Sequence, residues 1–151
     1  MVETILKAME NHFTKAYLLF LKYVLNIMNS FNALFQSKTV LIHKITEASE
    51  NILKDFCSNF IKLEVLSNSD IKNIDVADPN NYLPSKSINL GIDSNEYIRH
   101  FSPVNYEQVK NLCLKFYITA ALEIKKRLPI NNIIFQQLRF LDPKLAPYGN
   151  S

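Results

Sequence analysis

The strongest constraint on how this chain folds is an apolar series that recurs every three or four residues near its N-terminus. Its members are Ile5, Met9, Phe13, Ala16, Phe20, Val24, Ile27, Phe31 and Leu34. A second series beside it comprises Leu6, Tyr17, Leu21, Met28 and Phe35. Residues at this spacing share one side of an α-helix, and the two series cover close to half of its circumference. The sequence therefore predicts one long helix, over about residues 3–35, that packs on more than one neighbour.

The composition favours helices over sheets. Of the 151 residues, 48% are apolar and 21% are charged, which is ordinary for a single globular domain with one core. The chain contains only two glycines, whereas sandwiches and barrels need glycine at their turns. We therefore expect an all-α fold, a long antiparallel helical bundle, in one domain over residues 1–146 with a frayed tail at 147–151.

Three later segments carry helical spacing as well. Apolar residues predict a second helix over about residues 39–62, antiparallel to the first. They predict a third helix over about residues 105–128, which Pro129 ends because proline lacks the amide proton that a helix requires. A short fourth helix is predicted over about residues 130–140.

The segment between the second and third helices lacks this spacing and is rich in Asn, Asp, Ser and Pro. We expect an ordered loop over about residues 64–96 that folds over the core, because so long a connection without structure is uncommon in a compact domain. Within it, Asp78-Pro79-Asn80-Asn81 is a strong turn signal, and Ser87–Leu90 is a candidate extended piece. Gly91 is expected to hold a turn with positive φ.

No residue pattern predicts catalysis. Five acids lie on the segment without periodicity, where no strand would fix them for two-metal chemistry, so an acidic loop in water is favoured over a metal site: Asp70, Asp75, Asp78, Asp93 and Glu96. The histidines and cysteines lack zinc-ligand spacing, and Cys57 and Cys113 fit buried thiols on helix faces. We expect no enzyme activity, no metal or cofactor and no small-molecule substrate.

The charge is uneven along the chain. From Tyr97 to Ser151 eight bases stand against three acids, a net +5, while the whole chain carries +3. Seven of these bases are candidate contacts for nucleic-acid phosphates: Lys110, Lys115, Lys125, Lys126, Arg127, Arg139 and Lys144. The alternative is a basic helix end in water, because lysine and arginine are favoured in the last turn of a helix.

Several segments, taken in order, resemble a known family. The run from Ala16 to Leu25 (AYLLFLKYVL) is followed by Ser30 to Ser37 (SFNALFQS). Shorter matches follow at residues 41–44, 60–62, 90–91, 115–117, 126–129 and 141–143. In order and spacing the chain resembles hAT-superfamily transposases and their domesticated zinc-finger relatives over nearly its whole length.

The resemblance implies a transposon origin and a nuclear location. The chain is similar to the helical region inserted into the ribonuclease-H-like catalytic fold of those transposases, and it lacks the zinc finger that those proteins use for DNA. None of its acids matches a catalytic position of the family, which argues against autonomous transposase activity.

Two functions remain open from the sequence. The first is a non-catalytic, transposase-derived helical brace that retains some non-specific DNA contact through the basic C-terminal third. The alternative is a standalone protein-interaction domain that uses an exposed stripe of the first helix, and a large apolar patch left uncovered would favour it. We expect an intracellular protein without a membrane span, because Lys22 and Asn26 interrupt the apolar run from Ala16 to Met28.

Overall fold

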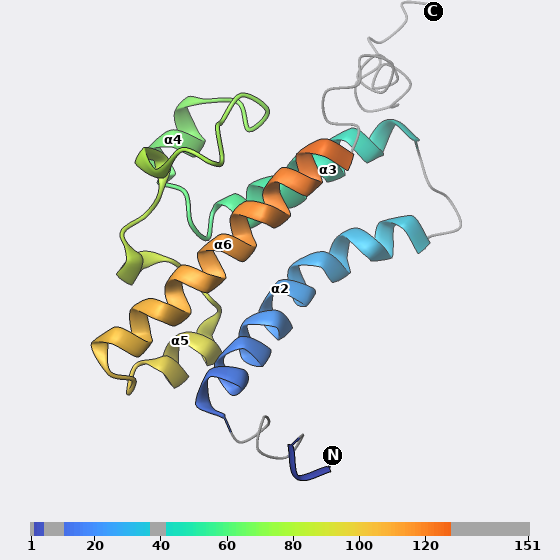
Figure 1. The fold of residues 1–151 in the computed structure, drawn as a ribbon. Coiled ribbons are helices and arrows are strands. Elements are labelled where there is room, and N and C mark those ends of the chain that lie inside the picture. The colour runs from blue at the N-terminus through green and yellow to red at the C-terminus, as the bar shows by residue number, and fades with distance from the viewer. Residues whose placement is uncertain (1, 5–10, 37–41, 128–151) are drawn as a thin grey trace, which may run out of the picture.

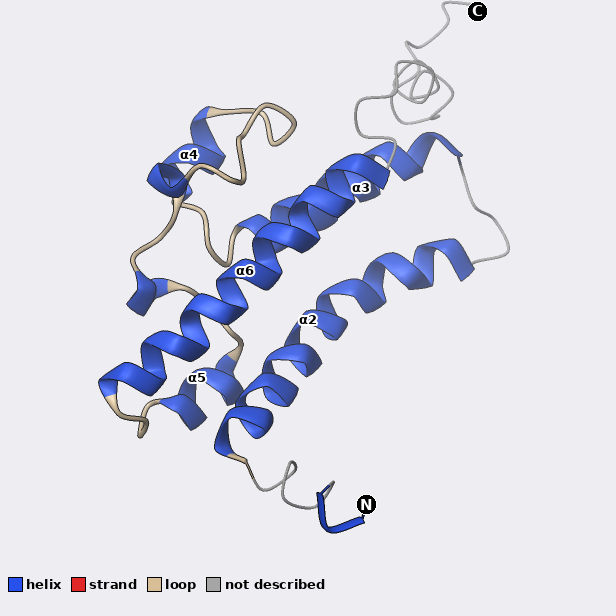
Figure 2. Cartoon of the chain, viewed as in Figure 1, coloured by secondary structure: helices blue, strands red, loops and turns tan. Residues whose placement is uncertain are grey.

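The computed structural model of the chain describes residues 2–4, 11–36 and 42–127. Three long helices form its body: α2 (His12–Gln36), α3 (Ile42–Cys57) and α6 (Pro103–Arg127). Between α3 and α6 lie α4 (Leu63–Asn68), the 3₁₀ helices η1 (Pro79–Asn81) and η2 (Ser85–Ser87), and α5 (Ile92–Ile98). The described ranges contain no strand, only one isolated antiparallel bridge between Ile61 and Tyr82 (Figure 2). The predicted all-α fold is confirmed.

The three long helices pack against one another as a bundle (Figure 1). Helix α3 runs opposite in direction to both α2 and α6, and the short helix α5 packs against the first half of α2. The connection from α3 to α5 runs beside α6, with Ile74 hydrogen-bonded to Lys125 near the end of that helix and Ile88 hydrogen-bonded to Lys110 near its start (Figure 1).

The core is one stripe from each long helix. The buried residues of α2 are Ala16, Phe20 and Val24, those of α3 include Ile52, Leu53, Phe56 and Cys57, and those of α6 include Val109, Cys113, Tyr117 and Ala121. The Tyr117 ring is the centre of this core, because Phe60 stacks on it at 5.6 Å and the edge contact with Phe20 is at 5.1 Å. Burial of these side chains supplies most of the stabilisation of the bundle.

The first two helices are shorter than the sequence predicts. Residues 2–4 are helical, but Asn11 is not, and its Oδ1 accepts a hydrogen bond from the Phe13 amide at 2.9 Å. The predicted continuous helix over 3–35 is therefore interrupted at Asn11, and α2 begins at His12. Helix α3 ends at Cys57 because the Asn59 side-chain amide donates to the carbonyls of Asp55 and Phe56 at the helix end. The predicted helix over 130–140 and the tail at 147–151 lie outside the described residues.

The connection from α3 to α5 is an ordered excursion over the core, as predicted. It differs from the prediction in its local structure. It contains α4, and α5 begins inside the predicted loop. In the segment Ser87–Leu90, Ser87 belongs to η2 and Ile88 has an extended backbone, with φ −64° and ψ 124°, but the segment forms no strand. The excursion is anchored by five buried side chains: Ile71, Ile74, Val76, Ile88 and Leu90. Gly91 has φ 90°, which confirms the predicted positive φ.

Asn89 joins this excursion to three helices. Its side chain donates to the hydroxyl of Tyr23 at 3.1 Å and to Oδ1 of Asn59 at 3.2 Å. Its Oδ1 accepts from the Gly91 amide and from the Asn95 side chain, both at 3.0 Å. Its backbone carbonyl accepts from the Tyr117 hydroxyl at 2.7 Å, so polar bonds fix the path of the chain between η2 and α5.

Candidate functional site

Lys110, a predicted phosphate contact, is instead part of the core. Its side chain is 2% exposed, and its Nζ donates to the carbonyl of Ile88 and lies 3.4 Å from Oδ1 of Asn95. The ammonium also lies 5.4 Å from the centre of the Tyr106 ring. The prediction for Lys110 is wrong because this position of α6 faces inward beside Val109, and an ammonium already bound to a buried carbonyl is not available to a phosphate.

The other predicted basic residues do not form one continuous surface. Lys125 donates to the carbonyl of Ile74 at 2.7 Å, and Arg127 pairs with Glu123 at 2.7 Å. Lys115 and Lys126 are exposed but lie three turns apart on α6, about 16 Å along its axis. The remaining candidates, Arg139 and Lys144, lie outside the described residues.

Three of the five candidate acids hold turns. Asp70, Asp75 and Asp78 each accept a hydrogen bond through Oδ1 from the backbone amide two residues later, which is the geometry of an Asx turn. Asp93 lies 3.8 Å from the exposed Lys22 ammonium. Across the part of the chain that the structure describes, no group of three or more His, Cys, Asp or Glu side chains is placed to hold a metal ion.

Both cysteines are buried and unpaired in disulfides, as the sequence predicts. Burial raises the pKa of the Cys57 and Cys113 thiols to about 12. Because the thiolate is the nucleophilic form, neither side chain is poised for nucleophilic chemistry near neutral pH.

An apolar stripe remains exposed on α2 after the bundle has packed. Its members are Leu18, Leu21 and Leu25, with 55%, 38% and 60% of each side chain exposed. Their spacing of three and then four residues is the spacing by which one helix docks on another. We call these three residues the leucine stripe.

Helix α6 also carries exposed apolar residues. Leu112 and Phe116 are 49% and 39% exposed, and the Phe116 ring contacts Phe20 of α2 edge-on at 5.4 Å. A groove of about 590 Å³ runs between the two helices, with Tyr17 and Leu112 among the residues that line it and Lys115 on the same lining. The leucine stripe, Leu112 and Phe116 are together called the α2–α6 surface below.

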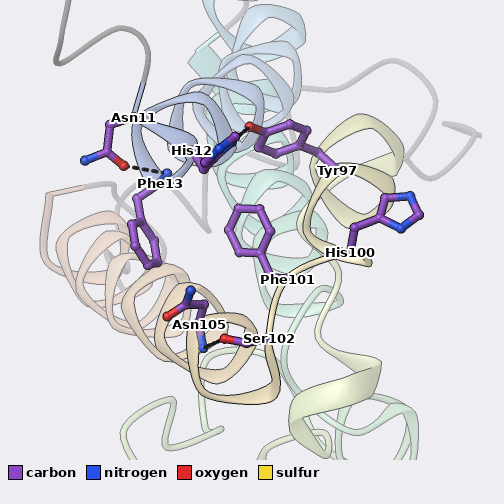
Figure 3. A pocket seen from close by; sticks show the side chains of 8 residues that line it. All are labelled: Asn11, His12, Phe13, Tyr97, His100, Phe101, Ser102 and Asn105. Atoms are coloured by element: carbon purple, nitrogen blue, oxygen red, sulfur yellow. Dashed lines mark hydrogen bonds between the residues drawn. The ribbon is translucent and has the colours of Figure 1, made fainter.

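A separate cavity of about 440 Å³ lies where α2 begins, α5 ends and α6 begins (Figure 3). Figure 3 shows the residues that line it: Asn11, His12, Phe13, Tyr97, His100, Phe101, Ser102 and Asn105. Three of these are aromatic, and no Asp or Glu is among them. This site is referred to as the aromatic cavity.

The walls of the aromatic cavity are held by ring contacts and one hydrogen bond. The Phe101 ring contacts Phe13 at 5.9 Å and Tyr97 at 5.5 Å, both edge-on. Nδ1 of His12 hydrogen-bonds the Tyr97 hydroxyl at 2.9 Å, which joins α2 to α5. Sequence reasoning missed this site because His12 and Tyr97 are 85 residues apart, and no periodicity indicates that two helix ends meet.

The comparisons with known proteins give no identification. Neither the scan of protein-family models nor the searches of curated proteins and of solved structures finds a match. None of the described helices combines the length and apolar character needed to cross a bilayer.

Proposed function

We propose that this chain is a non-catalytic helical docking module that binds a helix of a partner protein on its α2–α6 surface. The observation that carries the proposal is the leucine stripe, which is exposed to solvent while the opposite side of the same helix is buried. Apolar residues at helical spacing on a surface are the pattern by which grooves take up amphipathic helices.

The stripe offers enough apolar surface to matter for binding. Complete burial of one leucine side chain gives about 1.5–3 kcal/mol. Covering the exposed parts of Leu18, Leu21 and Leu25 is therefore worth about 2–4 kcal/mol, and Leu112 and Phe116 add to this. Association costs offset part of the gain, so we expect a weak, reversible complex rather than an obligate one.

The charges around the surface favour an acidic partner over a second copy of the chain. Helix α2 carries Lys15 and Lys22 and no acidic residue between His12 and Gln36. Lys22 lies 3.8 Å from the exposed Asp93 carboxylate, and the groove is lined by both Lys115 and Glu107, so the excess of positive charge lies on α2. A partner helix with glutamate or aspartate beside its apolar stripe would complement these lysines. Two copies docked through α2 would place lysines against lysines, which is unfavourable.

The resemblance to hAT transposases supports a proposal about origin. In such an enzyme a helical insertion would brace the catalytic core, and the α2–α6 surface would be the remnant of that contact. The same resemblance supports a nuclear location. Retained DNA contact has less support, because Lys110 and Lys125 donate to backbone carbonyls and Arg127 pairs with Glu123.

The experiment measures fluorescence anisotropy of labelled amphipathic peptides with the full chain. One peptide carries a leucine stripe flanked by glutamates, and the other carries lysines in their place. We expect tighter binding of the acidic peptide, and a loss of at least tenfold in affinity in the double variant Leu18→Gln/Leu25→Gln. The control is Leu63→Gln on α4, which changes a leucine that is 75% exposed, more than Leu18 or Leu25, and belongs to another helix.

Light scattering on the same samples completes the test. A monomeric chain that binds neither peptide contradicts the proposal. A chain that dimerises, and loses the dimer in Leu18→Gln/Leu25→Gln, also overturns it, because the occupant of the surface is then a second copy. Equal binding of both peptides refutes the argument from charge.

A further inference from the structure

We propose that Lys22 recognises a carboxylate of the partner helix, and that Asp93 competes with this carboxylate for the Lys22 ammonium. The inference rests on the docking proposal above. It adds to that proposal a residue that sets the specificity of binding and a contact within the chain that restrains binding.

Lys22 lies along one edge of the leucine stripe. It follows Leu18 by four residues and precedes Leu25 by three, so its side chain is a neighbour of both on the surface of α2. The Lys22 side chain is 68% exposed. A helix that covers the stripe with an acidic residue on this flank would therefore bring a carboxylate to the Lys22 ammonium.

The two other lysines near the α2–α6 surface are placed differently. The Lys15 ammonium lies 4.9 Å from the centre of the Tyr97 ring of α5, three residues before the stripe begins. Lys115 belongs to α6 and lines the groove together with Leu112. Lys22 is therefore the lysine of α2 that directly borders the most exposed leucines of the stripe.

In the chain without a partner, Lys22 already has an acidic neighbour on α5. The Asp93 Oδ2 lies 3.8 Å from the Lys22 Nζ, and the Asp93 side chain is 64% exposed. Helix α5 packs against α2 (Figure 1). The next residue, Ser94, fixes this contact, because it is buried and its hydroxyl donates to the Ala16 carbonyl of α2 at 3.2 Å. Asp93 is thus held beside Lys22 by the fold itself.

An ion pair between two exposed side chains is weak, so a partner carboxylate can replace Asp93 at Lys22. The two carboxylates would then lie close together, which is unfavourable. Removing the charge of Asp93 should therefore strengthen the binding of an acidic helix. We expect a gain of about twofold to fivefold in affinity, the range that one exposed ion pair supplies, and a smaller gain at high salt.

The test measures fluorescence anisotropy of the labelled acidic peptide with four forms of the full chain at low salt. These are the unaltered chain, Asp93→Asn, Lys22→Gln and the double variant. We expect tighter binding by Asp93→Asn and weaker binding by Lys22→Gln. In the double variant most of the gain from Asp93→Asn should disappear, because the two carboxylates compete for Lys22. A gain of the same size in the double variant overturns the inference.

The matched control is Glu96→Gln. It removes another exposed carboxylate of α5, three residues later, in the hollow that Lys15 lines rather than the one that Lys22 lines. Its effect on affinity should be smaller than that of Asp93→Asn, and circular dichroism checks that every variant is folded. An equal gain in Glu96→Gln, no gain in Asp93→Asn or no loss in Lys22→Gln refutes the inference and leaves the docking proposal standing. An unaltered chain that binds no peptide refutes both.

Discussion

Replacement of Gly91 by alanine should be among the most damaging single changes in this protein. The residue has φ 90° and ψ 154°, a region that residues with a Cβ adopt only with strain of about 1–3 kcal/mol. An added Cβ would also lie 2.6 Å from Cγ and 2.7 Å from Cβ of Tyr23. A Cβ cannot swing away as the end of a long side chain can, so either α2 or the 88–91 segment must shift.

That shift would disturb the hydrogen bonds that meet at Tyr23. Its hydroxyl donates to Asn59 at 2.7 Å and accepts from Asn89 at 3.1 Å, and each bond contributes about 1 kcal/mol. Together with backbone strain, the loss in free energy of unfolding should be about 3–5 kcal/mol. For a chain of this size that corresponds to a fall in Tm of roughly 6–20 °C.

Thermal and urea denaturation followed by circular dichroism measure the effect. The matched control is Ile92→Ala at the next position, where the side chain is 81% exposed and we expect a change below about 0.5 kcal/mol. A Gly91→Ala variant that loses less than about 1 kcal/mol would refute the reasoning, because neither strain nor the contact with Tyr23 would then be felt.

Three further predictions concern buried polar groups. The buried Thr46 hydroxyl has no hydrogen-bond partner within the described chain. Thr46→Val should therefore leave the free energy of unfolding unchanged or raise it by up to about 1 kcal/mol. A loss above about 1 kcal/mol in urea denaturation contradicts this. Because burial raises the pKa of Cys57 and Cys113 to about 12, the folded state retains protons that the unfolded state releases above pH 9, so stability should fall between pH 9 and 12. In the double variant Cys57→Ala/Cys113→Ala the urea midpoint should decline less steeply with pH over that range. A decline as steep as in the unaltered chain argues against raised thiol pKa values. Burial lowers the pKa of Lys110 from its usual 10.5, so just below that pH the folded state binds fewer protons than the unfolded state. The unaltered chain should therefore gain stability relative to Lys110→Met as the pH rises towards 10.5, and parallel stability curves would show that the ammonium is not desolvated.

The sequence predicts a helix well where the apolar spacing and the residues at the helix ends are enough to define its extent, without contacts from other segments. Helix α6 begins at Pro103 against a predicted start at about residue 105, because its periodicity is unbroken over Pro103–Arg127. The predicted stop at Pro129 lies outside the described residues. The end of α3 was missed because Phe60 keeps the helical spacing from Phe56 although it lies in the turn after the helix. Both rings are buried, so a periodic pattern reports burial and not helix alone.

The candidate sites were harder to predict because they depend on tertiary contacts. Lys110 was assigned to a basic surface because it lies in the basic C-terminal third of the sequence, whereas its burial depends on packing against the Ile88 carbonyl 22 residues earlier. The aromatic cavity requires three helix ends to meet, and no single segment encodes that meeting. The turn at Asp78 was predicted because its Asp-Pro-Asn-Asn signal is local, whereas the Asx turns at Asp70 and Asp75 were not predicted.

The leucine stripe shows why an apolar helix needs its neighbours before its function can be inferred. Leu18 and Leu25 belong to neither periodic series, yet they are more exposed than Leu19 and Leu21, the other leucines of α2 whose side chains are described. Residues two positions apart lie about 200° apart around a helix, so Leu18 points away from the side that carries Ala16 and Phe20. The core stripe and the leucine stripe therefore occupy opposite sides of α2. Polar substitutions in the leucine stripe should weaken docking without loosening the core, which allows the docking proposal to be tested on a folded protein.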